Sequence, residues 1–596
     1  MGSSVAQTIR RAARWIMPSD DPAAVALLQR ELGLQAPAAR VLVNRGWKEP
    51  SAARDFLFPD LTLLHNPLLM RDAGRAVTRI ERAIEAGERI LLYGDYDVDG
   101  TTSVVILKKA LELLGAEPRF HVPDRLKEGY GMNAAAIERA AADGVGLIIS
   151  VDTGIRDIEP IRLAQSLGID VIVTDHHIPE AELPPAFAVL NPNRHDCSYP
   201  EKNICGAGVV FKLIQALFDR AVGWSGPKAM SPPRRQALLD SFLKLVAVAT
   251  IADIVPLTGE NRVIVRRGLS GLEVVRNAGL RALLEVAGFA PGDRPSAGQV
   301  AFRLAPRINA AGRMANARDV IELFTTGDVA RAQELARQLD ALNRDRQQEE
   351  SDTVEEILAQ LNEHPLEPDS AALVFARSGW HLGVLGIVAS RLVERLSRPV
   401  FVLSSARTEG QWSGSGRSIP TFHLLEALES MSGLFVRFGG HRQAAGVTLD
   451  HANLDDFRRQ LAVYAAARLN PEDLCPQIKV DSRLDFAELN EAAVAEILSL
   501  APFGMGNPTP HFYAANVEVA APPRPLSDGK HLKVPLRQSG RTILLNAWRW
   551  GDRAAELQPG RKLEVVFNIE EDNFARKQGY GTWSLSLKDA RLQEPG

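Results

Sequence analysis

Short apolar runs alternate with amphipathic stretches through the first half of the chain. Residues 72–87 have the apolar spacing of a helix, and the run 89–93 that follows has the length of a buried strand. The same order recurs, with further strands expected over 146–151, 170–174 and 186–190. Because each strand is preceded by a helical stretch, the pattern predicts βαβ units and a mostly parallel sheet.

A second α/β region is expected over residues 366–470. Its apolar runs predict strands over 371–375 and 400–403. The segments 412–418 and 438–446 are rich in glycine, so we expect loops there in which the backbone comes close to a ligand.

From about residue 471 the chain changes to short alternating strands separated by turns. Such a pattern predicts an all-β domain of the OB type, a common platform for single nucleic-acid strands, although periodicity alone does not separate it from other small barrels. The patterns together predict a helical docking segment at 1–70, an α/β catalytic domain at 71–325, a long connecting helix at 326–365, a second α/β domain at 366–470 and the OB-like domain at 471–596.

Composition narrows the class of protein only slightly. A chain of 596 residues is too long for one core, and a net charge of −4 does not by itself identify a nucleic-acid binder. The three cysteines, Cys197, Cys205 and Cys475, have neither an even count nor close spacing, which argues against a disulfide framework or a structural zinc site. With no export signal and no membrane span evident, we expect a cytoplasmic protein.

Three aspartates follow the first strand at alternate positions: Asp95, Asp97 and Asp99, before Gly100. Carboxylates this close repel one another unless a cation lies between them, and a hard divalent cation is the usual one. One alternative is an EF-hand loop, but Ile106 occupies the position of its bidentate glutamate and a strand precedes the loop. The other is a solvated acidic turn.

Further acidic and imidazole groups follow the later strands. Parallel sheets collect ligands at the carboxyl ends of their strands, near a switch in strand order. Asp253 follows a thoroughly apolar helical run, where an unpaired charge would be costly, although a helix-capping role is an alternative. The groups that we expect to gather are Asp97, Asp99, Asp152, Asp175, His176, His177 and Asp253.

Carboxylates mixed with imidazoles suit Mn²⁺ or Mg²⁺ better than a softer metal. So many carboxylates would hold two ions, with Asp152 between them, and two ions favour hydrolysis of a phosphate ester or anhydride. Cationic groups for such a substrate occur in the segment 303–313, as Arg303, Arg307, Asn309 and Arg313. Alternatively these arginines belong to an ordinary polar helix face.

The segment Gly414–Ser418 contains a hydroxyl and a guanidinium, at Ser415 and Arg417, between glycines. It could be a mere turn, or a cradle of backbone and hydroxyl groups for a terminal phosphate.

The motifs at 94–100, 151–154 and 174–177 resemble those of the DHH phosphoesterase superfamily. The segments 381–391 and 439–446 resemble the DHH-associated domain of its members. Within the superfamily, segment 123–131, the arginine-rich segment and the C-terminal β region resemble the bacterial exonucleases that digest single-stranded DNA from the 5′ end. The resemblance covers the chain from about residue 50 to its end.

The resemblance implies roles for individual residues. His177 would lie next to the scissile phosphate, and Asp175 would orient a histidine without binding metal itself. The implied metal ligands are Asp97, Asp99, Asp152, His176 and Asp253. The implied phosphate-binding residues are Arg313 near the scissile bond and Arg125, Ser415 and Arg417 in a 5′-phosphate pocket. Some relatives have a ligating histidine where this chain has Tyr93, so the first metal would depend on Asp95 or on water.

The function implied is metal-dependent exonucleolytic degradation of single-stranded DNA to 5′-mononucleotides by two-metal hydrolysis, in repair and recombination. Alternatives are a phosphodiesterase for short oligonucleotides or cyclic dinucleotides, and a binding scaffold that has lost catalysis. Every expected acidic and histidine position is filled, which favours an enzyme, and the β extension favours a polymeric substrate. We expect a monomer that works beside a single-strand-binding protein and a helicase.

Overall fold

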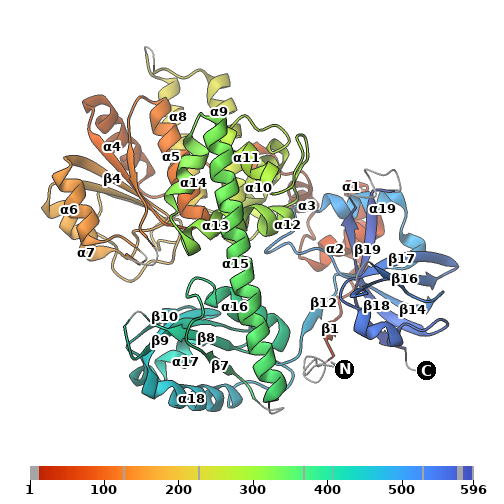
Figure 1. The fold of residues 1–596 in the computed structure, drawn as a ribbon. Coiled ribbons are helices and arrows are strands. Elements are labelled where there is room, and N and C mark those ends of the chain that lie inside the picture. The colour runs from red at the N-terminus through yellow and green to blue at the C-terminus, as the bar shows by residue number, and fades with distance from the viewer. Residues whose placement is uncertain are drawn as a thin grey trace. The chain divides into compact units, whose positions relative to one another are not determined.

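The computed structural model describes residues 12–124, 128–129, 131–225, 228–366, 370–406, 408–526, 529–572 and 581–593. These residues form two compact units (Figure 1). The larger unit joins residues 18–342 to residues 481–596, and the smaller joins the segment that ends at Met17 to residues 343–480. Among the described residues, no helix combines the length and apolarity needed to cross a membrane.

A five-stranded parallel sheet within the larger unit confirms the predicted βαβ arrangement. Its strands are β2 (Arg89–Gly94), β3 (Arg119–His121), β4 (Val145–Val151), β5 (Asp170–Thr174) and β6 (Ala188–Leu190), in the order β3-β2-β4-β5-β6. The chain first moves from β2 to β3 on one side and then to β4 on the other. The carboxyl ends of β2 and β4 therefore flank the switch point at which such sheets bind ligands.

Helices cover both faces of this sheet. The helices around it are α4 (Ala73–Ala86), α5 (Val98–Leu113), α6 (Ala134–Ala142), α7 (Ile158–Ser166), α8 (Gly206–Val222) and α9 (Pro232–Ala252). Ile137 of α6 and Ile161 of α7 share a core with Ile148 and Val171 on one face. On the other face α4, α5, α8 and α9 pack into a larger core. The strands are apolar on both faces because both faces are buried.

A helical region follows the sheet. It consists of α10 (Gly259–Gly271), α11 (Ala278–Val286), α12 (Ala297–Gln299), the π-helical turn η3 (Val300–Leu304), α13 (Ala305–Met314), α14 (Arg318–Thr325) and α15 (Val329–Glu363). Helix α15 is the long connecting helix predicted from the sequence, and it runs from the larger unit into the smaller one.

The C-terminal part of the larger unit is a closed barrel. Its elements are β13 (Ser482–Arg483), η6 (Phe486–Glu488), α19 (Glu491–Ser499), β14 (Phe512–Val519), β15 (Arg524–Leu526), β16 (His531–Gln538), β17 (Arg541–Ala547), η7 (Gly551–Glu556), β18 (Lys562–Glu571) and β19 (Trp583–Leu592). The pairing runs β14-β18-β19-β17-β16, and β16 pairs again with β14. This closure confirms the OB-like barrel, which also carries helix α19.

The N-terminal helices share the hydrophobic core of the barrel domain. They are α1 (Pro22–Leu32), α2 (Ala36–Asn44) and α3 (Pro50–Leu57), followed by the 3₁₀ turns η1 (Leu61–Leu63) and η2 (Pro67–Leu69). Leu28, Leu42 and Phe56 are buried in one cluster with Leu484 and Phe567. The first helices of the chain and its last strands are therefore parts of one folded body.

The smaller unit contains a five-stranded mixed sheet in the order β10-β11-β9-β8-β7. Its elements are β7 (Leu373–Ala376), α16 (Leu385–Leu396), β8 (Val400–Ser405), β9 (Gln411–Arg417), α17 (Leu424–Glu429), η4 (Ser432–Leu434), β10 (Arg437–Gly440), β11 (Ala444–Asp450), η5 (His451–Asn453) and α18 (Leu454–Ala466). A separate pair of parallel strands joins β1 (Arg14–Ile16) to β12 (Gln477–Lys479).

The expectation of loops at 412–418 and 438–446 was wrong, because these segments form strands β9, β10 and β11. The glycines of β9 have a packing reason. A Cβ atom at Gly414 would collide with the carbonyl oxygen of Val402, and one at Gly416 would collide with the ring of Phe401. Close packing within a sheet, and not loop flexibility, accounts for glycine at these two positions.

Candidate active site

The acidic loop after β2 is a tight strand-to-helix turn. Asp97 is the N-cap of α5, and its carboxylate accepts a hydrogen bond of 3.0 Å from the N–H of Gly100. A Cβ atom at Gly100 would lie 2.7 Å from Asp95, so only glycine lets the helix begin this close to the preceding loop. Asp95 and Asp99 are buried. A buried turn that follows a strand is neither an EF-hand nor a solvated acidic turn.

Asp99 is held by the N-terminus of α8. The backbone N–H of Gly206 donates to Asp99 Oδ2 over 2.6 Å, and the N–H of Ala207 donates to Oδ1 over 2.8 Å. The positive end of a helix dipole favours a carboxylate at this place. A Cβ atom at Gly206 would lie 2.7 Å from both Cβ and Oδ1 of Asp152. Gly206 therefore lets two carboxylates approach the same helix end.

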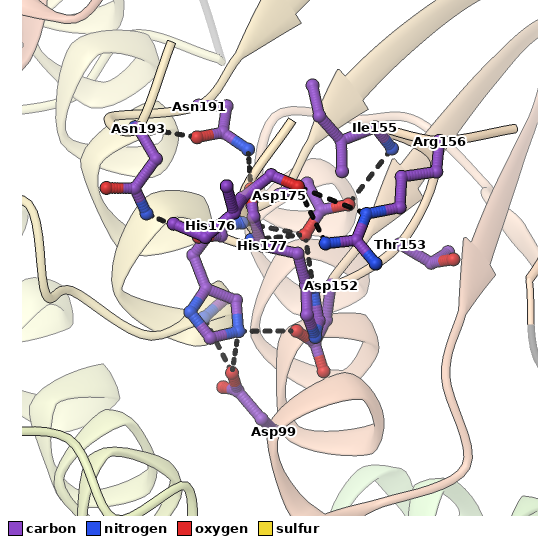
Figure 2. Close-up of polar contacts among 12 residues, drawn as sticks. Asp99, Asp152, Thr153, Ile155, Arg156, Asp175, His176, His177, Asn191 and Asn193 are labelled. Atoms are coloured by element: carbon purple, nitrogen blue, oxygen red, sulfur yellow. Dashed lines mark hydrogen bonds and ion pairs between the residues drawn. The ribbon is translucent and has the colours of Figure 1, made fainter. Parts of the chain in front are cut away.

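The carboxylates of three separate elements converge on His176. Its Nε2 lies 3.2 Å from Asp152 Oδ1, 3.8 Å from Asp99 Oδ2 and 3.8 Å from Asp253 Oδ2. Figure 2 shows the contacts to Asp99 and Asp152. Asp253 is the C-cap of α9, so it both ends a helix and faces the cluster.

Asp175 orients His177. Its Oδ1 lies 2.7 Å from His177 Nδ1 and also accepts hydrogen bonds from the backbone N–H groups of His176 and His177. Its Oδ2 accepts from the N–H of Ile155 over 3.0 Å (Figure 2). With both oxygens engaged in this way, the buried Asp175 fixes the loop and the imidazole.

Two asparagines that the sequence analysis did not single out hold the histidine loop from the other side. Asn191 Nδ2 donates to the carbonyl oxygen of His177 over 2.8 Å, and Asn193 Nδ2 donates to that of His176 over 2.6 Å (Figure 2). Both follow β6, the fourth strand after the acidic loop. Their position at a strand end, in an Asn-Pro-Asn turn, was the available signal.

Burial and mutual repulsion change the proton affinities of the cluster. Burial, with the charge of Asp99, raises the pKa of Asp97 and raises that of Asp253 to about 8. The same causes raise the pKa of Asp152 well above its ordinary value. Burial lowers the pKa of His177, but the hydrogen bond to Asp175 and the negative charges of Asp175, Asp253 and Asp99 together outweigh it and raise the pKa to about 9. The cluster therefore favours protons or other cations among its carboxylates.

The donor atoms fit divalent cations. Three sets of ligand atoms each lie within 4.8 Å of one another: Asp95, Asp97 and Asp152; Asp99, His176 and Asp253; and Asp152, His176 and His177. Carboxylate oxygens with imidazole nitrogens suit Mn²⁺ and Mg²⁺. Asp152 and His176 each belong to two of the sets.

Tyr93 forms hydrogen bonds to the neighbouring loop. Its hydroxyl donates to the carbonyl oxygen of Gly131 over 3.2 Å and accepts from Asn133 Nδ2 over 3.0 Å. The tyrosine therefore ties strand β2 to the segment before α6. Asp95, two residues later, is the group that joins the carboxylate cluster.

A pocket of about 330 Å³ opens beside the cluster. It is lined by Asp95, Tyr96, Asp97, Ala252, Asn309, Gly312 and Arg313. Helix α13 forms one wall, and Asn309 Oδ1 accepts a hydrogen bond of 3.3 Å from the N–H of Val98. A Cβ atom at Gly312 would collide with the carbonyl oxygen of Tyr96, so glycine lets α13 lie directly on the acidic loop.

The other two candidate phosphate ligands of this segment point elsewhere. Arg303 donates to the carbonyl oxygens of Ala287 and Gly288 over 3.0 Å each. Arg307 donates to Asp340 over 2.9 Å. The structure thus brings Asn309 and Arg313 to the carboxylate cluster, whereas Arg303 and Arg307 bond to other partners. Arg125 lies outside the described residues.

In the smaller unit, a hydroxyl and a guanidinium meet at the start of a helix. Ser415 and Arg417 project from β9 beside the first turn of α16, because a Cβ atom at Gly386 would lie 2.9 Å from Arg417 Nη2 and 3.6 Å from Ser415 Oγ. A helix N-terminus combined with such groups is suited to bind a phosphate.

Three parts of the chain match known protein families. Residues 89–250 match the DHH family, N-terminal domain; residues 369–467 match the DHHA1 domain; and residues 480–589 match the RecJ OB domain. The first match spans the parallel sheet and its acidic strand ends, the second spans the mixed sheet, and the third spans the barrel.

Similar proteins include single-stranded-DNA-specific exonucleases named RecJ. That of Bacillus subtilis is 36% identical, over 98% of this chain and 71% of that protein. That of Escherichia coli is 35% identical, over 84% of this chain and 87% of that protein. The crystal structure of RecJ in complex with Mn²⁺ from Thermus thermophilus matches with a TM-score of 0.81 and 32% identity, over 98% of this chain and 80% of that chain.

Proposed function

The chain belongs to the RecJ family of DHH phosphoesterases, and we propose from this that it removes mononucleotides from the 5′ end of single-stranded DNA with two divalent cations. The observation that carries the proposal is the convergence of three carboxylates on His176 at the switch point of the parallel sheet. Such a cluster is suited to phosphodiester hydrolysis.

The residues that would hold Mn²⁺ or Mg²⁺ are Asp95, Asp97, Asp99, Asp152, His176 and Asp253. When bound, two such cations generate a hydroxide nucleophile and neutralise the charge that develops on the phosphate. The α8 N-terminus keeps Asp99 in place, and Gly206 leaves room for Asp152 beside it. Asp175 orients His177 and contributes to raising its pKa to about 9, so that a protonated His177 ring suits a phosphate oxygen.

Residues of the pocket and of the smaller unit would bind the rest of the strand. Arg313 and Asn309, beside Asp95 and Asp97, suit the scissile or a neighbouring phosphate. Ser415 and Arg417, beside the α16 N-terminus, suit the 5′-terminal phosphate, and we assign Arg125 to the same phosphate. Arg303 and Arg307 hold their own helix through hydrogen bonds, which supports a structural role for them.

A single-stranded substrate fits the barrel domain, because such barrels bind extended strands through stacking and phosphate contacts. The activity would serve repair and recombination, with a helicase to supply single strands and a single-strand-binding protein to cover them. We infer a monomer in the reducing cytoplasm. The described cysteines are all free, which agrees with that compartment.

The test is digestion of one oligonucleotide labelled at either end, with its blunt duplex in parallel, in Mn²⁺. We expect the 5′-labelled strand to release labelled mononucleotide at once, the 3′-labelled strand to shorten progressively, and the duplex to remain intact. Internal cuts, or release that begins at the 3′ end, would refute the proposed polarity. Activity confined to very short strands would favour an oligonucleotide phosphodiesterase.

A further inference from the structure

Phe302 exposes a large apolar ring beside the catalytic region. Its side chain is 76% exposed, the largest fraction among the exposed large hydrophobic side chains of the described residues. It lies in η3, the π-helical turn within the continuous helical run 297–314. Such turns are rare in proteins, and those that occur are often found at functional sites. An exposed phenylalanine forgoes the free energy that burial would give, so a ligand-binding role is a natural reason for it.

The helical run that carries Phe302 connects two hollows of the larger unit. At its C-terminal end, Asn309 and Arg313 line the metal-binding pocket. At its N-terminal end, Gln299 and Arg303 line a second hollow of about 1080 Å³. The opposite wall of that hollow comes from the barrel side, at residues 498–509 and 569–571. Phe302 thus lies on the helical run that joins the pocket beside the carboxylate cluster to the hollow beside the barrel domain.

Phe302 and the pocket residues share one side of the helix. Positions 302, 306, 309 and 313 are spaced by four, three and four residues and are all at least partly exposed, whereas Leu304, Ile308 and Ala311 are buried. Asn309 is seven positions after Phe302, a rise of roughly 10 Å along the helix. About three stacked nucleotides span that distance, at roughly 3.4 Å each.

The neighbouring arginine leaves the ring of Phe302 available. Arg303 turns away and stacks on Phe289, with its guanidinium carbon 4.1 Å from that ring centre, while donating to Ala287 and Gly288. Arg313 and Asn309 can contact phosphates, but a phenylalanine ring offers only an apolar face. Bases stack on such a face with little regard to sequence, which suits an enzyme that degrades any strand.

We propose that Phe302 stacks on a base of the DNA strand on the 3′ side of the scissile phosphate, between the metal-binding cluster and the barrel domain. This inference rests on the proposed exonuclease function and adds a substrate contact to it. Phe302 is therefore a positioning residue, since it holds the strand while the carboxylate cluster acts on a phosphate farther along.

The test uses the full-length protein and a set of six 3′-labelled oligo(dT) strands. Each strand carries a single abasic residue, at a different one of the first six positions from the 5′ end. With Mn²⁺, we expect the wild type to show a slower first cleavage at one or two of these positions, because the base that stacks on Phe302 is missing. On the intact strand, Phe302→Ala should lower kcat/KM about ten-fold, as the loss of one stacked base does. The same variant should no longer respond to the abasic residue.

Two further variants separate stacking from other effects. Phe302→Trp keeps an aromatic face and should retain the abasic response, whereas Phe302→Leu keeps bulk without that face and should lose it. Phe58→Ala removes another phenylalanine of the same unit, which is 67% exposed and lines neither hollow, and should behave as wild type. Because Phe302 is exposed, thermal unfolding of its variants should match the wild type.

Other outcomes would overturn the inference. An abasic penalty that persists in Phe302→Ala, or no penalty at any position, would show that no base stacks there. A change of oligomeric state in Phe302→Ala would show that the ring contacts another protein copy instead. Anisotropy with labelled oligo(dT) in EDTA measures strand binding without catalysis. A wild type that binds but does not cleave would contradict the exonuclease proposal, while weaker binding by Phe302→Ala would still support the stacking contact.

Discussion

Gly206 donates its backbone N–H to Asp99 over 2.6 Å, and the space where its Cβ would lie is filled by Asp152. One glycine at the start of α8 thus contacts two carboxylates that come from different strand ends. The cluster is shaped by a helix that begins far along the chain from the acidic loop, as well as by the loop itself.

Gly206→Ala should impair the metal-binding cluster while leaving the fold intact. The added methyl group would lie 2.7 Å from Asp152 and push that carboxylate away from its partners. We expect Mn²⁺ affinity to fall about ten-fold, in line with the 1–3 kcal/mol that overpacking typically costs. Isothermal titration with Mn²⁺ measures this directly, and nuclease activity should fall with it.

Gly74→Ala is the matched control, since Gly74 also lies in the first turn of a helix, α4, but has open space around its Cβ position. Alanine has a higher helix propensity than glycine, so this variant should be at least as stable as wild type. Wild-type Mn²⁺ affinity in Gly206→Ala would show that Asp152 can shift without consequence.

Asp152→Asn should abolish hydrolysis without unfolding the protein. Asp152 has a positive φ of 60°, a conformation that asparagine tolerates better than alanine does, so this change removes the charge without adding backbone strain. The loss of the negative charge of Asp152 also relieves repulsion among the buried carboxylates. We expect less than about a tenth of wild-type activity if Asp152 holds two ions. The unfolding temperature in EDTA should be unchanged or higher, and a fall would point to a structural role instead.

The metal-free protein should lose stability as the pH rises from about 5.5 to 8.5. The folded-state pKa of Asp253 is raised to about 8 by burial and by Asp99, and that of His177 is raised to about 9 by Asp175. A group whose pKa is raised on folding contributes stability that is present below its unfolded pKa and is lost as pH rises through the folded value. Both groups therefore act in the same direction over this range.

Thermal unfolding in EDTA and in Mn²⁺ at the two pH values measures this effect. We expect Mn²⁺ to stabilise the protein more at pH 8.5, because protons compete with the ion for the carboxylates at lower pH. Asp253→Asn should flatten the dependence in EDTA. A metal-free protein that gained stability toward pH 8.5 would contradict the raised pKa values.

Arg417→Ala should weaken the use of 5′-phosphorylated strands selectively. Arg417 meets Ser415 at the first turn of α16, and a charge-assisted contact to phosphate is worth about 1.5–3 kcal/mol, or roughly ten- to hundred-fold in kcat/KM. Single-turnover rates on 5′-phosphate and 5′-hydroxyl strands give the ratio. Arg459→Ala, on the outer face of α18 and paired with Asp456, is the control. Equal losses of rate on 5′-phosphate and 5′-hydroxyl strands would show that Arg417 does not bind the 5′-phosphate.

Local patterns were enough to predict the strand ends of the site. Strands β2, β4 and β5 are short apolar runs in a βαβ sequence, so Asp97, Asp152 and His176 were expected at one edge of a sheet. The contact between Asp99 and Gly206 could not be predicted, because it joins distant segments through the backbone of a glycine. Spacing alone says nothing about which helix end will meet a carboxylate.

Two further differences between the predictions from the sequence and the structure have physical reasons. In the segment 303–313, Arg303 donates to the carbonyl oxygens of Ala287 and Gly288 and Arg307 donates to Asp340, and these partners lie too far along the chain for spacing to reveal them. In β9, glycine suggested a loop, but the ring of Phe401 and the backbone of the neighbouring strand occupy the space of its side chains. Long-range packing decided both cases.

The core that α1, α2 and α3 share with the barrel has a consequence for biosynthesis. These helices leave the ribosome before the strands that bury Leu28 and Leu42 are made. At about 5–20 residues per second, the roughly 400 residues between them take from about 20 to 80 s to synthesise. Throughout that interval the nascent helices display apolar side chains with no partner strand yet made. We expect ribosome-associated chaperones to bind this N-terminal stretch during translation. Prematurely terminated chains should aggregate through it.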